Sequence, residues 1–264
     1  MIFMINSLNI LLSNAANFSV NISMSPQTVE GLKKSGSQLY GFKVVKALVK
    51  GGVPLVWFVT KDYLVNTTVE WSQDYHAYIS TQLNPSPPDI IKSCPLRKTT
   101  DDMSKTNSFI EQRFAATSCS SERVKLGEKM VVDEFGNTTV DKSDDNNVIS
   151  IVNKATTPWT CGISQALLNP VAFKPISAFP LYGQHNINIT PLNKVILMFA
   201  SSSPSIETGA VVLKSWADSI LIDLMDMESR NVTYDLNTGW SPTEQIWTKY
   251  IPNNSDITQL TIEN

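Results

Sequence analysis

Residues 53–80 constrain the fold of this chain most strongly, because they contain three strand patterns separated by turn residues. Residues 55–59 form a short apolar run rich in β-branched and aromatic side chains, which is typical of a strand covered on both faces. Between residues 65 and 71 apolar and polar side chains alternate, as in a strand with one packed and one solvated face. The alternation resumes at residues 75–79. This stretch therefore predicts neighbouring strands around a core that contains Trp57.

Most other segments also favour short strands over helices. Four prolines within residues 170–191 exclude a long helix there. The one helix expected spans Pro26–Lys34, with Ser25 as its N-cap and Gly36 after its end. We therefore predict an all-β fold of two tandem antiparallel β-sandwich domains with one short helix near the N-terminus. A single large β-sandwich is the alternative.

The domain prediction depends on length and on one polar segment. A chain of 264 residues fits two domains of about 120 residues or one large β domain. Residues 141–147 carry no apolar anchor and are the best boundary. The predicted domains are residues 1–141, with a long proline-rich loop at 84–105, and residues 148–264. The apolar run that contains Phe199 resembles the one that contains Trp57, so Phe199 is also predicted to lie in a core. Either an internal repeat or chance could explain this similarity.

Composition excludes some classes of protein. The formal net charge is −3 and no cluster of Lys and Arg occurs, which argues against binding to duplex nucleic acid. The apolar N-terminus has no Lys or Arg before Lys33 and lacks the charged start of a signal peptide. The compartment therefore stays open between the cytoplasm, release without a clear signal peptide, and secretion. The sequence contains no run of about 20 apolar residues, so no membrane span is predicted.

The three cysteines have no CxxC spacing, so neither a disulfide framework nor a zinc site is indicated. Cys94 and Cys119 form the easiest pair, because they flank the same predicted loop, but free thiols are favoured. Cys161 would be left over. No cofactor or metal site is predicted.

The chain offers few groups for catalysis. The sequence around Ser164 resembles a nucleophile elbow, but Pro170 comes too soon for the helix that this motif needs. Of the two histidines, His76 falls on the polar face of a strand pattern and is expected at the surface. Residues 141–152 lack the Gly and Glu of a calcium-binding loop. We therefore expect no enzymatic activity.

The remaining candidates for function are aromatic and polar residues in segments rich in Gly and Pro. They predict binding of a glycan, a lipid head group or a protein surface, in a lectin-like or toxin-like manner. One alternative is that the aromatics close the end of the core. The other is that the chain is a self-assembling subunit, which would form a homo-oligomer through its strand edges. The candidate ligand-binding residues are Tyr182, Gln184, His185, Trp240 and Trp247.

Overall fold

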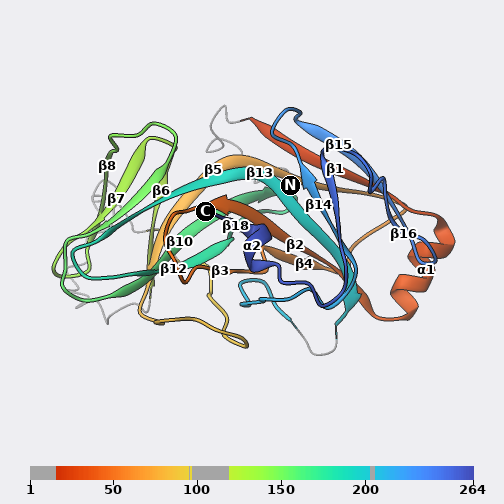
Figure 1. Cartoon of the computed structure of the whole chain (residues 1–264), viewed down its shortest axis with the longest axis horizontal. Coiled ribbons are helices and arrows are strands. Elements are labelled where there is room, and N and C mark those ends of the chain that lie inside the picture. The colour runs from red at the N-terminus through yellow and green to blue at the C-terminus, as the bar shows by residue number, and fades with distance from the viewer. Residues whose placement is uncertain (1–15, 95, 97–118, 203–205) are drawn as a thin grey trace, which may run out of the picture.

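The computed structural model describes residues 16–94, 96, 119–202 and 206–264, which form two large β-sheets packed face to face (Figure 1). The N-terminal segment considered as a signal peptide lies outside the described residues, as does much of the predicted loop at 84–105. The all-β prediction is confirmed.

Sheet 1 is organised around β5 (Asn66–Ser80), its longest strand, which pairs with strands on both sides. Most neighbours are antiparallel, and one edge includes a parallel pair. In order, sheet 1 contains β16 (Gly239–Ser241), β15 (Ser229–Asp235), β1 (Asn17–Ser23), β5 (Asn66–Ser80), β10 (Trp159–Leu168), β12 (Ser177–Leu181) and β3 (Val53–Pro54), with β11 (Val171–Pro175) paired to β10 and β6 (Cys119–Val124) paired to β5.

Sheet 2 is organised in the same way around β13, a strand of 16 residues that pairs with β9, β2 and β14. In order, sheet 2 contains β17 (Thr248–Ile251), β14 (Ser219–Asp223), β13 (Asn186–Ser201), β9 (Ile149–Asn153), β7 (Glu128–Val132) and β8 (Thr138–Lys142), with β2 (Ser37–Lys46) paired to β13, and β4 (Phe58–Thr60) and β18 (Ile262–Glu263) paired to β2.

Strands from both halves of the chain occur in each sheet, which corrects the predicted division into two tandem sandwiches. β1 lies between β5 and β15, and β2 pairs with β13 over most of its length. Residues 143–148 only connect β8 to β9 within sheet 2, so the polar segment at 141–147 is not a domain boundary. The alternative of one large β-sandwich describes this arrangement.

Helix α1 (Pro26–Lys34) has the bounds that the sequence predicts. Ser25 caps it by accepting a hydrogen bond of 3.0 Å from the backbone N–H of Thr28, and Val29 and Leu32 pack into the core. A second helix, α2 (Thr258–Thr261), is a single turn before β18 and was not predicted.

The main core lies between the sheets and takes side chains from both. Trp57 is fully buried and Phe199 nearly so, which confirms both as core residues. Aromatic truncation in such a core costs about 3–5 kcal/mol. Smaller apolar clusters cover the outer faces, where the segment around Ile91 packs on Tyr78 and the segment around Val212 packs on Phe42.

A disulfide joins Cys94 to Cys119, so the expectation of free thiols at these two positions is wrong. Ser121 donates a hydrogen bond of 3.1 Å to the carbonyl oxygen of Cys94 and holds the two segments side by side. The Cα atoms of the cysteines are 5.6 Å apart, which suits a disulfide. Cys161 is free and buried.

Candidate functional site

Three loops meet at one end of sheet 2 because of the directions of its strands. β7 and β9 are parallel, so the loops that follow them, residues 133–137 and 154–158, leave at the same end. β13 is antiparallel to β9, so the turn before it, residues 182–185, arrives there too. We call these three loops the loop end. Backbone hydrogen bonds join them, from Lys154 N–H to Val132 O at 2.8 Å and from Gln184 N–H to Ala155 O at 2.9 Å.

The first loop holds an exposed phenylalanine on a rigid turn. The Asp133 carboxylate accepts hydrogen bonds of 2.8 Å from the backbone N–H groups of Phe135 and Asn137. Gly136 adopts the left-handed conformation, with φ of 78°, which the turn requires. The Phe135 side chain is 87% exposed. Its ring is therefore held in water by a turn that is already ordered.

The second and third loops hold Tyr182, Gln184 and His185 in one turn. Asn153 donates from Nδ2 to the carbonyl oxygens of Thr157, at 2.8 Å, and Tyr182, at 3.1 Å. The Tyr182 side chain is 60% exposed, and its ring centroid lies 6.1 Å from that of His185. His185 Nδ1 lies 2.7 Å from the carbonyl oxygen of Gly183, which fixes the direction of the imidazole.

Trp159 lies beneath the loop end. It pairs with Leu181 in sheet 1, and the Gly136 backbone approaches its ring so closely that a Cβ there would be 3.3 Å away. The sequence did not mark Phe135 or Trp159 as site residues. Phe135 lies in the turn between β7 and β8, and Trp159 is the first residue of β10, so the only available signal was an aromatic side chain in or next to a turn.

The surface of the loop end combines aromatic rings with neutral polar groups. Glu134 and Lys154 are its exposed charged residues. An arrangement of this type can place a ring against an apolar ligand face while amides and hydroxyls bind the polar rim of the ligand. The exposed neutral polar side chains are those of Asn137, Thr156, Thr157, Gln184 and Asn186.

The predicted site residues Trp240 and Trp247 are not at the loop end. β16 lies with α1 at one end of the molecule, whereas β7 and β8 lie at the other (Figure 1). Trp240 is 3% exposed, and its ring centroid lies 5.4 Å from that of Phe199 and 4.9 Å from that of Tyr234. The structure therefore places Trp240 in the core, as the alternative interpretation held.

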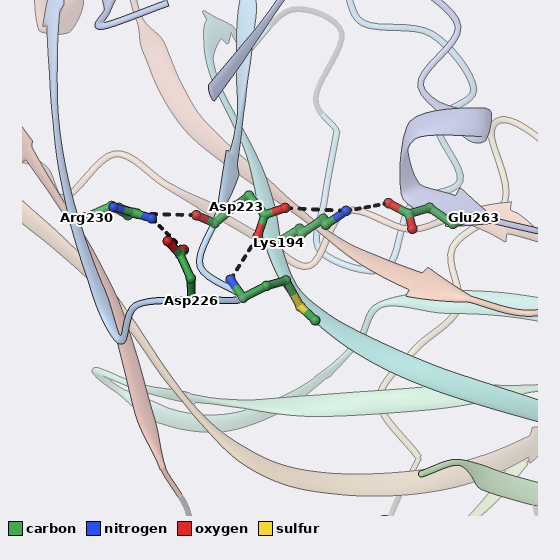
Figure 2. A network of polar contacts seen from close by, with 6 residues as sticks. Lys194, Asp223, Asp226, Arg230 and Glu263 are labelled. Atoms are coloured by element: carbon green, nitrogen blue, oxygen red, sulfur yellow. Dashed lines mark hydrogen bonds and ion pairs between the residues drawn. The ribbon is translucent and has the colours of Figure 1, made fainter. Parts of the chain in front are cut away.

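Trp247 contacts Arg230, which belongs to a polar network with Asp226, Asp223, Lys194 and Glu263. Figure 2 shows this network. The Arg230 guanidinium lies 4.7 Å from the Trp247 ring centroid and forms an ion pair of 2.5 Å with Asp226. In the same network Lys194 lies 2.8 Å from Glu263 and 3.4 Å from Asp223.

Ser164 and His76 are cross-strand partners, but their setting does not suit catalysis. Ser164 lies in the middle of β10, not at a strand-to-helix turn, and both side chains are buried. The Phe173 ring stacks on His76 with centroids 3.6 Å apart and covers it. Burial, helped by Arg123 and opposed by Asp74, lowers the pKa of His76 to about 4. The expectation of a surface imidazole is wrong, because this part of β5 is covered on both faces.

Among the described residues, no group of three or more His, Cys, Asp or Glu side chains is placed to hold a metal ion. Neither α1 nor α2 is long and apolar enough to cross a membrane. Comparisons found no matching family model, no similar curated protein and no similar solved structure.

Proposed function

We propose that this protein binds carbohydrate through the loop end. The observation that carries the proposal is the exposure of the Phe135 and Tyr182 rings, at 87% and 60%, on hydrogen-bonded turns at the same end of the sheet. An exposed ring on an ordered turn loses little conformational entropy when a ligand binds. Sugars offer apolar C–H faces to such rings and hydroxyl groups to the side chains around them.

The polar groups of the loop end support a glycan more than a membrane. Binding to anionic lipid head groups needs several basic side chains close together. Here Lys154 is accompanied by the carboxylates of Asp133 and Glu134 and otherwise by amides, hydroxyls and one imidazole. Gln184 and His185 can donate and accept hydrogen bonds, as the hydroxyl groups of a sugar require. The proposed role therefore favours an uncharged, hydroxyl-rich ligand.

Glycan arrays followed by titration calorimetry test this function. Phe135→Ala and Tyr182→Ala are each expected to weaken binding about tenfold or more, which corresponds to about 1.4 kcal/mol. Gln184→Ala and His185→Ala are expected to produce smaller losses. Ile246→Ala is the matched control, because Ile246 is fully exposed and lies outside the loop end.

Bound glycan should also protect Trp159 from a soluble fluorescence quencher, because this ring lies beneath the loops. The proposal fails if the wild-type protein binds no glycan, or if both aromatic variants fold and bind as the wild type does.

Self-assembly through strand edges is the alternative function, and the ends of sheet 1 offer it little support. β3 has 2 residues and β16 has 3, and short edge strands pair poorly with other chains. A monomeric size on a calibrated sizing column would count against assembly, and large particles would favour it.

A further inference from the structure

Two adjoining hollows flank the segment that connects β4 to β5, far from the loop end. Leu64 and Asn66 line both hollows. Two hydrogen bonds order the segment. The backbone N–H of Met24 donates one of 2.7 Å to the carbonyl oxygen of Val65, and the Tyr63 hydroxyl donates one of 2.8 Å to the carbonyl oxygen of Ser37. Leu64 nevertheless stays 65% exposed on the ridge between the hollows.

The first hollow is an apolar trough between α1 and Val65, with a volume of about 850 Å³. Pro26 and Val29 form its wall on the helix side. Lys33 and Lys34 border it and can lay their aliphatic stems along the apolar surface while their amines stay in water. The trough is therefore suited to a hydrocarbon chain.

The second hollow is a cleft of about 610 Å³ between β4, the start of β5 and the turn from β10 to β11. Phe58 and Val69 contribute apolar surface to its lining. Polar side chains surround them, including those of Asp62, Glu70 and Asn169. Such a lining offers hydrogen bonds to several hydroxyl groups and is suited to a polar head.

The charges of the two hollows balance. Three carboxylates line them, and so do three amines, but the cleft itself has two of the carboxylates and one amine, so an anionic head there would meet more repulsion than attraction. A neutral head avoids this and still uses the donors and acceptors of the cleft. The carboxylates are those of Glu30, Asp62 and Glu70, and the amines are those of Lys33, Lys34 and Lys174.

We infer that these hollows together bind one molecule of a neutral glycolipid. The sugar head occupies the cleft, and the hydrocarbon chain passes over Leu64 into the trough.

This site is separate from the loop end. The cleft lies at the start of β5, and Ser80 at the end of β5 pairs with Thr160, next to Trp159. At about 3.3 Å per residue, the distance along β5 from Val69 to Ser80 is about 35 Å. The inference therefore does not depend on the proposed function of the loop end.

Titration calorimetry with a panel of dodecyl glycosides, each below its critical micelle concentration, tests the inference. At least one glycoside is expected to bind about tenfold more tightly than its free sugar and than dodecylphosphocholine, which has the same chain on a zwitterionic head without sugar hydroxyl groups. Leu64→Asp is expected to remove the contribution of the chain. Glu70→Gln is expected to reduce the preference for the sugar head and to leave binding of the chain in place.

Leu48→Asp is the matched control, because Leu48 is 84% exposed and lines neither hollow. Equal binding of glycosides and dodecylphosphocholine would reduce the site to a nonspecific apolar patch and overturn the inference. So would binding by none of the panel up to its critical micelle concentration, or equal effects of Leu64→Asp and Leu48→Asp. Leu64→Asp should leave the binding of glycans without a hydrocarbon chain at the loop end unchanged, so failure here and failure of the loop end are distinguishable.

Discussion

Lys43 and Lys194 lie on paired strands of sheet 2, one register step apart, yet they face opposite sides of the sheet. Lys43 on β2 is the partner of Val195 on β13, and both side chains point into the main core. Lys194 precedes Val195 on β13 and points outward. The two lysines are therefore neighbours in one sheet, although Lys194 lies where the β2–β13 register shifts, and they differ in what surrounds the amine.

Lys194 has carboxylates within reach (Figure 2). Its amine contacts Glu263 at 2.8 Å and Asp223 at 3.4 Å, and its side chain is 21% exposed. Burial alone would lower the pKa of Lys194, but the hydrogen bond and charge of Glu263, together with Asp223, outweigh it and raise the pKa above its ordinary value. The network connects β13 and β14 to the C-terminal strand β18.

Lys43 has no such partner among the described residues. Its Nζ is buried without a hydrogen bond, 4.2 Å from the Trp71 ring centroid and 5.5 Å from that of Trp57. Burial holds the pKa of Lys43 well below its ordinary value. The ring faces attract a cation and oppose part of this shift. We infer that a nearby carboxylate, and not the strand, decides whether a lysine removed from water stabilises the fold, whether it is partly buried like Lys194 or fully buried like Lys43.

The largest expected effect on stability comes from removing a tryptophan beside Lys43. Trp71→Ala removes a fully buried indole and the ring face closest to Lys43, and it should lower the free energy of unfolding by about 3–5 kcal/mol. Urea denaturation followed by circular dichroism measures this. Combining Trp71→Ala with Lys43→Met gives the coupling between ring and amine, and strictly additive changes in the free energy of unfolding would show that the ring does not stabilise the amine.

The second effect has the opposite sign. Lys43→Met replaces an unpaired buried amine with an apolar side chain of similar length and should raise the free energy of unfolding at pH 7 by about 1–3 kcal/mol. Lys46→Met is the matched control, because Lys46 is exposed on the same strand, and it should change stability by less than about 0.5 kcal/mol. A destabilised Lys43→Met protein would mean that the amine has a stabilising role.

The pH dependence of Lys43→Met sharpens this prediction. Because the folded pKa of Lys43 is below its ordinary value of 10.5, the unfolded chain holds an extra proton between the two values. Wild-type stability should therefore rise relative to Lys43→Met as pH increases from 7 toward 10. A difference that is constant over this range would contradict the lowered pKa of Lys43 in the folded protein.

Local features of the fold could be predicted from sequence, and pairing between distant strands could not. The cap at Ser25 and the stripe of Val29 and Leu32 are local signals, and α1 was predicted with its observed bounds. One partner of β1 is β15, more than 200 residues away in the sequence, and periodicity does not encode such a pairing. The tandem-domain prediction failed for this reason.

The candidate site shows the same limit. Tyr182, Gln184 and His185 could be grouped because they share one turn, whereas Phe135 joins them only through the parallel pairing of β7 and β9. Trp240 follows a turn glycine, and nothing local indicates that its ring enters the core. The burial of Lys43 could not be predicted for another reason. Leu39 and Val45 share its face of the strand and indicate an inward side chain, but a lysine at that position argues against burial.

The smallest effect concerns the paired lysine. Lys194→Met removes two ion pairs that are partly exposed to water, so it should lower the free energy of unfolding by only about 0.5–1 kcal/mol. The folded pKa of Lys194 is raised, so this contribution is present below the ordinary value of 10.5 and is lost as pH rises through the folded value. The loss should also shrink in high salt, which screens the pairs. Lys249→Met, at an exposed position of the same sheet, is the control. If Lys194→Met stabilised the protein as Lys43→Met is expected to do, carboxylates beside the amine would not be what separates the two lysines.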